Sequence, residues 1–190
     1  PILRQNAVTG ANYLAFDGSN DFLRTNKTNF TATNKVSLFA GMRKLNNSTG
    51  EMLFELSPLI SNIGTFHMYL TLGLPVPYWT AVSNLGSSIT ANTPIIPSPP
   101  RSDVLAIRAT GNPSSISLRL NSAQAASLAA PQGANNYGNY PLYIGSRAGG
   151  SLFFNGHIYG LIGVGKLVSD NETLAIEKEL AKRVGVAINV

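Results

Sequence analysis

The sequence contains no cysteine among its 190 residues. This absence excludes disulfide bonds, thiolate metal ligands and cysteine nucleophiles. A fold without disulfides can form in a reducing cytoplasm, even when the protein later works outside a cell. At this length a chain can still bury a sizeable hydrophobic core as one domain. We therefore expect one domain that spans residues 1–190.

Charged residues are also scarce, at 12%, whereas hydrophobic residues make up 44% of the chain. The formal net charge of +5 comes from scattered basic residues, whose only adjacent pairs are Arg43-Lys44 and Lys182-Arg183. A nucleic-acid-binding surface would cluster such residues on one face or interleave them with aromatics. We therefore expect a mildly basic, solvated surface and no nucleic-acid partner.

Long apolar runs are missing as well. Stretches such as residues 160–165 are far too short to cross a bilayer, so we expect no membrane insertion. The sequence starts at Pro1 with no basic and hydrophobic leader, which predicts that it has no signal peptide. A start at proline also suggests processing, or a fragment of a longer chain.

What the sequence does contain is turn residues and alternating apolar segments. Its 18 glycines and 11 prolines, with abundant Asn, Ser and Thr, favour many turns. Residues 36–45 and 51–56 alternate in the way that half-buried strands do, with Val36, Leu38, Ala40 and Met42 on one side of the first. We predict strands over residues 13–16, 22–24, 36–45, 51–56, 65–73, 78–84, 103–110, 115–124, 141–147, 156–166 and 186–190.

Glycine and proline also place the connections. Asp17-Gly18 predicts a hairpin between the first two strands, and Gly111-Asn112-Pro113 predicts another between residues 103–110 and 115–124. Residues 92–102 are proline-rich, so they cannot form a central strand. Residues 45–50 and 130–139 are polar loops, the second rich in Gly and Asn.

One helix is expected near the C-terminus. Ser169 and Glu172 have the spacing of a capping box, and Gly185 is placed to end the helix. The apolar side would consist of Leu174, Ile176, Leu180 and Val184. The fold class is therefore all-β, mostly antiparallel, with one short C-terminal helix.

The order of these segments resembles the concanavalin A-like jelly roll in its laminin-G-like branch. The residues that carry the resemblance are YLAFDGSNDFLRT, KVSLFAGMRK, GEMLFELS, SISLRLNS, PLYIGSR and residues 153–186. The resemblance implies a two-sheet antiparallel sandwich over nearly the whole chain. The wording of FAGMRK, FELS, NYPLYIGSR and FNGHIYGLI looks like the version found in structural proteins of tailed bacteriophages. This implies a tail, fibre or decoration protein of a virion, folded in the host cytoplasm, or otherwise a module on an extracellular surface.

Glu51 and Glu55 raise the question of glycosidase activity. Jelly-roll glycosidases that resemble this fold carry Glu-x-Asp-x-Glu on one strand, but here Leu53 occupies the central position. A retaining glycosidase needs two carboxyl groups about 5–5.5 Å apart, one ionised and one protonated. Without the central aspartate, we favour the interpretation that both glutamates lie on a solvated strand face.

Other catalytic and metal sites find little support. His67 and His157 are the only histidines, and no G-x-S-x-G motif accompanies them, so we expect both to be structural. Asp17, Asp21 and Asp170 are candidates for calcium. In an EF-hand loop that starts at Asp17, Phe22 would replace the required glycine and Thr28 the required glutamate. We therefore expect no metal ion and no cofactor.

Carbohydrate binding needs aromatic surfaces together with planar polar groups. Two places offer them: Tyr78 and Trp79, which follow prolines in a loop-like context, and a second loop that holds Asn135, Asn136, Tyr137 and Tyr140. Trp79 could serve either as a binding platform or as a core aromatic that seals the edge of the sandwich. The second loop has the composition of an adaptable recognition surface. These residues are the predicted ligand-binding site.

Three functions follow from these observations. The first is a non-enzymatic, lectin-like module that attaches a virion or a bacterial surface to cell-surface glycans or to neighbouring virion proteins. The second is a purely structural decoration or fibre domain that stabilises a phage particle, with homo-oligomers allowed. The third is a divergent glycosidase.

Overall fold

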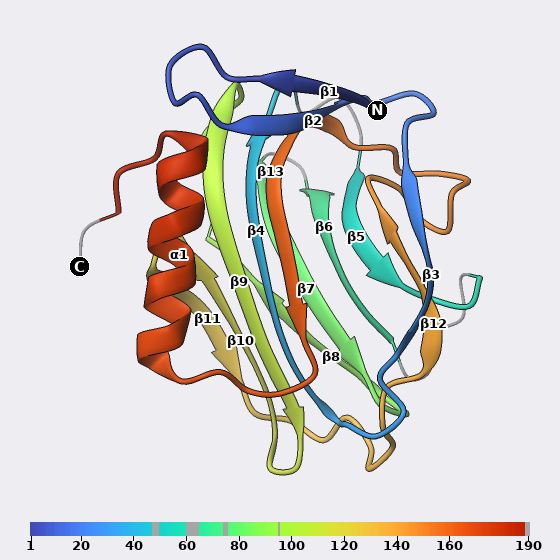
Figure 1. Ribbon diagram of the computed structural model, residues 1–190. Coiled ribbons are helices and arrows are strands. Elements are labelled where there is room, and N and C mark those ends of the chain that lie inside the picture. Colours follow the sequence, from blue (N-terminus) through green and yellow to red (C-terminus); the bar gives the residue numbers. More distant parts are fainter. Residues whose placement is uncertain (47–49, 60–64, 74–75, 95, 189–190) are drawn as a thin grey trace.

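The protein, seen here in a computed structural model that describes residues 1–46, 50–59, 65–73, 76–94 and 96–188, is a sandwich of two antiparallel sheets (Figure 1). The seven-stranded sheet has the order β1-β2-β13-β4-β9-β10-β11. Its strands are β1 (Ile2–Gln5), β2 (Asn12–Asp17), β4 (Lys35–Lys44), β9 (Arg101–Gly111), β10 (Ser114–Leu120), β11 (Ala123–Leu128) and β13 (Asn155–Val164).

The six-stranded sheet has the order β3-β12-β5-β6-β7-β8. Its strands are β3 (Leu23–Asn29), β5 (Glu51–Leu56), β6 (Thr65–Gly73), β7 (Val76–Asn84), β8 (Ser88–Asn92) and β12 (Asn139–Ile144). The predicted all-β sandwich with one C-terminal helix is therefore confirmed.

The main core lies between the two sheets, and β4 shows how the sequence builds it. Val36, Leu38, Ala40 and Met42 all face this core, as their alternation predicts. Phe39, on the opposite side of the same strand, is equally buried because the helix covers it. A strand that is covered on both faces reads as a nearly continuous apolar run.

Helix α1 (Asp170–Val184) packs on the outer face of the seven-stranded sheet, against β4 and β9 (Figure 1). The predicted capping box is present: the amide of Glu172 donates to Ser169 Oγ at 3.2 Å, and the amide of Ser169 donates to Glu172 Oε2 at 2.7 Å. Gly185 ends the helix in the left-handed conformation, with φ of 77°. Within the described ranges, no helix is long and apolar enough to span a membrane.

The predicted strand over residues 186–190 is wrong for its described part. Residues 186–188 have no regular structure, and residues 189–190 lie outside the described residues. Ile188 packs against the apolar cluster beneath the helix, which includes Phe39 and Val168. Burial of this side chain in that cluster takes the place of pairing with a strand.

The turn at Asp17 and Gly18 corrects a second prediction. Gly18 has the expected positive φ, at 76°. However, β2 pairs with β1 and β13, whereas β3 pairs with β12 in the other sheet. The segment is therefore not a hairpin, because it carries the chain from one sheet to the other.

The second predicted hairpin is confirmed, since β9 and β10 pair antiparallel across Gly111 and Ser114. The predicted strand over residues 115–124 is instead broken by a tight turn at Asn121 and Ser122, whose φ angles are 51° and 67°. β11 begins at the next residue and pairs back on β10. The described residues of the loop predicted over 92–102 lie between β8 and β9, and residue 95 lies outside the described residues. Of the loop predicted over 45–50, residues 47–49 also lie outside the described residues.

Candidate functional site

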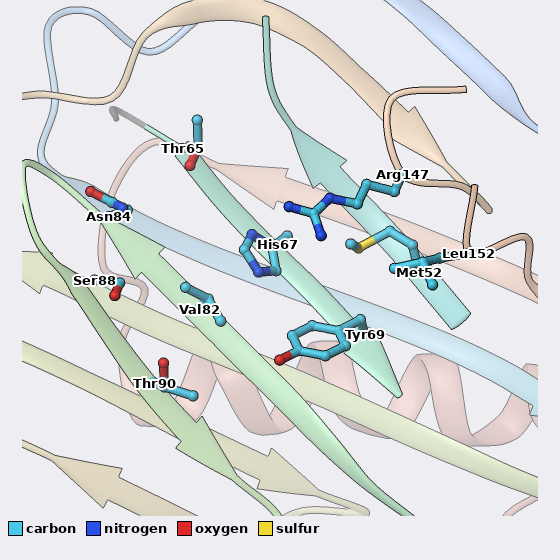
Figure 2. A pocket seen from close by; sticks show the side chains of 10 residues that line it. All are labelled: Met52, Thr65, His67, Tyr69, Val82, Asn84, Ser88, Thr90, Arg147 and Leu152. Atoms are coloured by element: carbon cyan, nitrogen blue, oxygen red, sulfur yellow. The ribbon is translucent and has the colours of Figure 1, made fainter. Parts of the chain in front are cut away.

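The outer face of the six-stranded sheet carries the strongest candidate site. Helix α1 packs on the other sheet and does not cover this face (Figure 1). Along β6, Phe66, Met68 and Leu70 enter the core, so the alternate residues point outward. These outward positions, with neighbours on β5, β7 and β8, line a pocket of about 290 Å³. This pocket, here named the β5–β8 groove, is lined by Met52, Thr65, His67, Tyr69, Val82, Asn84, Ser88, Thr90, Arg147 and Leu152 (Figure 2).

The loop between β12 and β13 brings Arg147 to the rim of the groove. The amide of Arg147 donates to the carbonyl of Ser151 at 2.8 Å, and the amide of Gly150 donates to the carbonyl of Arg147 at 3.0 Å. Ala148 and Gly149 both adopt positive φ, so the loop turns tightly. Figure 2 shows the guanidinium of Arg147 extending toward the ring of His67.

His67 lies in the floor of the groove and is uncharged over most of the pH range. Burial, together with the positive charge of Arg147, lowers the pKa of His67 to about 4. Its ring centroid lies 5.5 Å from that of Tyr69. A neutral imidazole offers one hydrogen-bond donor and one acceptor, which suits a hydroxyl-rich ligand.

Glu55 supports the Arg147 loop from below. It lies opposite His67 in the β5–β6 register, so it is on the same face of the sheet. Its Oε2 accepts a hydrogen bond from the amide of Ala148 at 3.0 Å, and its Oε1 lies 4.0 Å from Arg147 Nε. Burial raises the pKa of Glu55, although the Ala148 amide and Arg147 oppose that shift. The carboxylate therefore ties the loop to the sheet.

Glu51 points away from Glu55, which removes the basis for a glycosidase pair. Between Met52 and Phe54 the β5–β6 register shifts, and Glu51 lies opposite the core residue Leu70. Such a bulge reverses the alternation of side chains along a strand. Glu51 instead reaches β4 and β13, where its Oε1 lies 2.5 Å from Lys44 Nζ and its Oε2 accepts from the amide of Asn155 at 2.8 Å.

The expectation that both glutamates are solvated is wrong. Glu51 is 1% exposed and Glu55 is 2% exposed. Glu55 accepts from the amide of Ala148 in the loop between β12 and β13, and Glu51 accepts from the amide of Asn155 at the start of β13. Buried carboxylates need such partners. Both glutamates therefore have structural roles.

Two of the four aromatic residues of the predicted ligand site are inside the protein. Trp79 is 0% exposed in the core of β7, so of its two interpretations the core aromatic is the one that the structure supports. Tyr137 is 1% exposed, and its hydroxyl lies 2.6 Å from Ser83 Oγ in a buried polar network. Neither ring offers a free face to a ligand.

The remaining predicted residues lie apart from one another. Tyr78 is half-buried in β7, and Tyr140 is half-buried in β12, where it packs against the main core. Asn135 and Asn136 are exposed, and Asn136 Nδ2 donates to the carbonyl of Thr31 at 2.8 Å. None of the predicted residues lines the β5–β8 groove.

A second hollow, of about 530 Å³, lies between the β9–β10 turn and residues 129–134, beside the loop that holds Asn135 and Asn136. Its lining is mostly alanine, glycine and proline, with Ser114 and Gln132 as the polar members. The side chain of Gln132 is occupied, because it bonds Ser83 Oγ at 2.5 Å and the carbonyl of Thr110 at 2.8 Å. This hollow lacks the convergent polar groups that a specific site needs.

The aspartates considered for calcium serve the first turn. Asp17 Oδ1 accepts from the amides of Ser19 at 2.8 Å and Asn20 at 3.2 Å, and these bonds lower the pKa of Asp17. Asp21 contacts the N-terminal amine of Pro1 at 2.7 Å. In the described part of the chain, no three His, Cys, Asp or Glu residues group closely enough to hold a metal ion.

The other two residues singled out from the sequence also have structural neighbours. His157 lies in β13, in the other sheet from His67, and stacks on Tyr13 with ring centroids 4.2 Å apart. Asp170 forms an ion pair with Arg108 at the start of the helix. The two histidines therefore do not form one site.

Sequence reasoning missed the groove although one signal for it was present. The alternation over residues 65–73 separates Thr65, His67 and Tyr69 from the apolar residues between them. A polar and aromatic side of a strand indicates either solvent or a ligand, and only the placement of β7, β8 and Arg147 beside it distinguishes them.

The sequence matches no protein-family model and no curated protein sequence, whereas many solved structures share its fold. A heptameric SAP-like pentraxin from Limulus polyphemus aligns over 90% of this chain and 84% of its own, with TM-score 0.71 and 10% identity. The CBM40 of a Ruminococcus gnavus IT-sialidase, bound to α2,3-sialyllactose, aligns over 82% and 98%, with TM-score 0.59 and 16% identity.

Domains LG4-5 of the mouse laminin α1 chain give a similar result. They align over 80% of this chain and 40% of their own length, with TM-score 0.59 and 16% identity. At such identities the likeness concerns the fold. The chain has the lectin-like jelly-roll fold that is also found in pentraxin, laminin G and CBM40 domains.

Proposed function

We propose that this protein is a non-enzymatic, lectin-like module that binds a carbohydrate in the β5–β8 groove. The observation that carries the proposal is the lining of the groove, in which hydroxyl, amide, imidazole and guanidinium groups surround an aromatic ring on an uncovered sheet face. Such a lining can pair with sugar hydroxyls while Tyr69 contacts the apolar face of a sugar ring. The volume, near the lower limit of about 300 Å³ for ligand pockets, suits a single sugar residue.

The fold likeness supports this proposal. The R. gnavus CBM40 that shares the fold was solved with α2,3-sialyllactose. The opposite directions of Glu51 and Glu55 argue against the glycosidase alternative, because the two carboxyl groups cannot act on one bond from opposite faces of a sheet.

We further propose that binding serves attachment on a virion or a bacterial surface. The support is the resemblance of FAGMRK, FELS, NYPLYIGSR and FNGHIYGLI to structural proteins of tailed bacteriophages. Cell-surface glycans and neighbouring virion proteins are the proposed partners.

A structural decoration or fibre role is the second candidate. The observation that favours it is the exposed apolar surface of the β1–β2 hairpin, where Ile2 is 61%, Leu3 67% and Val8 94% exposed. Large apolar side chains that are exposed in this way can contact another protein. In this role the hairpin, and not the groove, would be the functional surface.

Titration of the intact chain against paired acidic and neutral oligosaccharides tests the first proposal. Tyr69→Ala should weaken binding by about 10-fold, the effect of losing a sugar–aromatic contact. Tyr13→Ala is the matched control, because Tyr13 stacks on His157 in the other sheet and should leave binding within about 2-fold.

Two results would overturn the proposal. One is the absence of binding to any sugar, or binding that Tyr69→Ala leaves unchanged. The other is turnover of a bound oligosaccharide that is lost in Glu55→Gln, since that would make the protein an enzyme.

A further inference from the structure

We infer that the β5–β8 groove recognises the carboxylate of an acidic sugar, and that Arg147 is the residue that selects it. The inference rests on the proposed function and gives it a ligand class. It follows from the position of one guanidinium, the state of the groups around it and the rigidity of the loop that carries it.

Arg147 has hydrogen-bonding capacity that the protein leaves unused. Among the described residues, its buried Nε atom has no hydrogen-bond partner, and the nearest carboxylate oxygen, Glu55 Oε1, lies 4.0 Å away. Its side chain is 33% exposed, so the guanidinium reaches the surface of the groove. The exposed part of the guanidinium is therefore free to donate hydrogen bonds to a ligand oxygen.

Arg147 also sets the charge that a ligand meets. It is the only charged side chain among the described residues that line the groove. His67 adds no charge near neutral pH, because its pKa is about 4. Glu55 lies beneath the Arg147 loop, where its Oε1 forms an ion pair with Arg147 at 4.0 Å and its Oε2 accepts from the amide of Ala148, so it does not line the groove. The surface of the groove therefore presents one positive group among neutral donors and acceptors.

A planar carboxylate is the partner that this arrangement fits best. The guanidinium offers parallel N–H groups in one plane, which pair with both oxygens of a carboxylate. The neutral imidazole of His67 and the hydroxyl groups of Thr65 and Thr90 can then pair with sugar hydroxyls. Met52 and Leu152 give an apolar boundary at the Arg147 side of the groove (Figure 2).

The loop holds the arginine in place before a ligand arrives. Glu55 bonds Ala148, Ser146 Oγ accepts from the amide of Gly149 at 3.1 Å, and the pairing of Arg147 with Ser151 closes the turn. Ser146 itself is fully buried. A group that is positioned in advance loses less conformational entropy on binding, so the arginine should discriminate strongly.

Titration calorimetry with α2,3-sialyllactose, sulfated lactose and lactose tests the inference. Sialyllactose should bind at least about 10-fold more tightly than lactose, as expected for a charge-assisted pair. Arg147→Met should abolish that preference, so that sialyllactose and lactose bind with equal affinity. Arg147→Lys should restore only part of it, because lysine lacks the planar fork. Arg4→Met is the matched control, since Arg4 is exposed on β1 in the other sheet.

The outcomes separate this inference from the proposed function. If lactose and sialyllactose bind equally and Tyr69→Ala weakens both, the carbohydrate site stands and the acidic-sugar inference fails. Tighter binding of sulfated lactose than of sialyllactose would also overturn the choice of a carboxylate. If none of the sugars binds, both proposals fail. Folding of each variant is checked by its thermal unfolding midpoint.

Discussion

At the scale of single residues, Lys44 and Glu51 form an ion pair that is almost fully enclosed. Each side chain is 1% exposed, and the Nζ–Oε1 distance is 2.5 Å. Burial lowers the pKa of Lys44 and raises that of Glu51, while each charge opposes the shift of the other. Each charge needs the other, because either one alone would be strongly destabilising in this buried position.

Lys44→Met should therefore destabilise the protein by about 3–5 kcal/mol, since it leaves the Glu51 carboxyl without its partner. The double variant Lys44→Met with Glu51→Gln should recover most of this loss, because glutamine is neutral and can still accept from the Asn155 amide. Urea unfolding of the wild type and both variants measures the free energies. Equal losses in the single and double variants would contradict the pairing argument.

His67 predicts a dependence of stability on pH. Its pKa is about 4 in the folded protein and 6.5 when exposed. As the pH falls below 6.5, the unfolded chain takes up a proton that the folded protein does not. The free energy of unfolding should thus fall by up to about 3 kcal/mol from this residue, and the loss is complete below about pH 4.

His67→Gln removes that titration. As the pH falls from 6.5 to 4, the free energy of unfolding of His67→Gln minus that of the wild type should rise steadily. Urea unfolding at several pH values measures the difference, and the comparison cancels the contributions of groups that both proteins share. A difference that does not vary with pH would show that His67 titrates normally.

At the scale of elements, the features that depend on local chemistry were predictable. The helix follows from Ser169, Glu172 and Gly185, which lie within or next to it, and the β9–β10 hairpin follows from Gly111 and its neighbours. A capping box or a tight turn is fixed by residues that are adjacent in sequence. The local sequence is therefore enough to predict these elements.

Elements whose partners are distant in sequence were harder to predict. The turn at Asp17 and Gly18 has hairpin chemistry, yet the strands on its two sides join different sheets. The bulge after Met52 places Glu51 and Glu55 on opposite faces, and no residue in EMLFEL predicts this bulge. Register and sheet membership depend on the partner strands, which a local pattern does not contain.

At the scale of the whole molecule, the helix and the two sheets share buried surfaces. One apolar cluster lies between the sheets, and a second lies between α1 and the seven-stranded sheet. β4 contributes to both, with Leu38 on one side and Phe39 on the other. Loss of either layer would expose residues of the same strand, so the layers should unfold together.

Differential scanning calorimetry should therefore show one transition, with equal calorimetric and van't Hoff enthalpies. Far-ultraviolet circular dichroism and tryptophan fluorescence should give the same midpoint, because Trp79 reports on the sandwich core. Two separate transitions would contradict the expectation of one domain over residues 1–190.

The candidate site forms only in the complete fold, and for this reason the sequence did not reveal it. Four strands supply the floor of the β5–β8 groove, and Arg147 arrives from a loop far along the chain. Trp79 and Tyr137 have the residue types of a sugar-binding site, but the packing of the two sheets encloses both. Composition identifies the chemistry that is available, and only the fold decides which side chains meet solvent.

The alternation along β6 has a consequence for how the protein can change. Its inward residues hold the two sheets together, whereas its outward residues face the groove and contribute less to the core. Substitutions at outward positions, such as Tyr69 on β6 or Ser88 and Thr90 on β8, can thus accumulate at little cost to stability. A lineage, or a combinatorial library, could exchange one ligand for another on this face while the scaffold behind it stays the same.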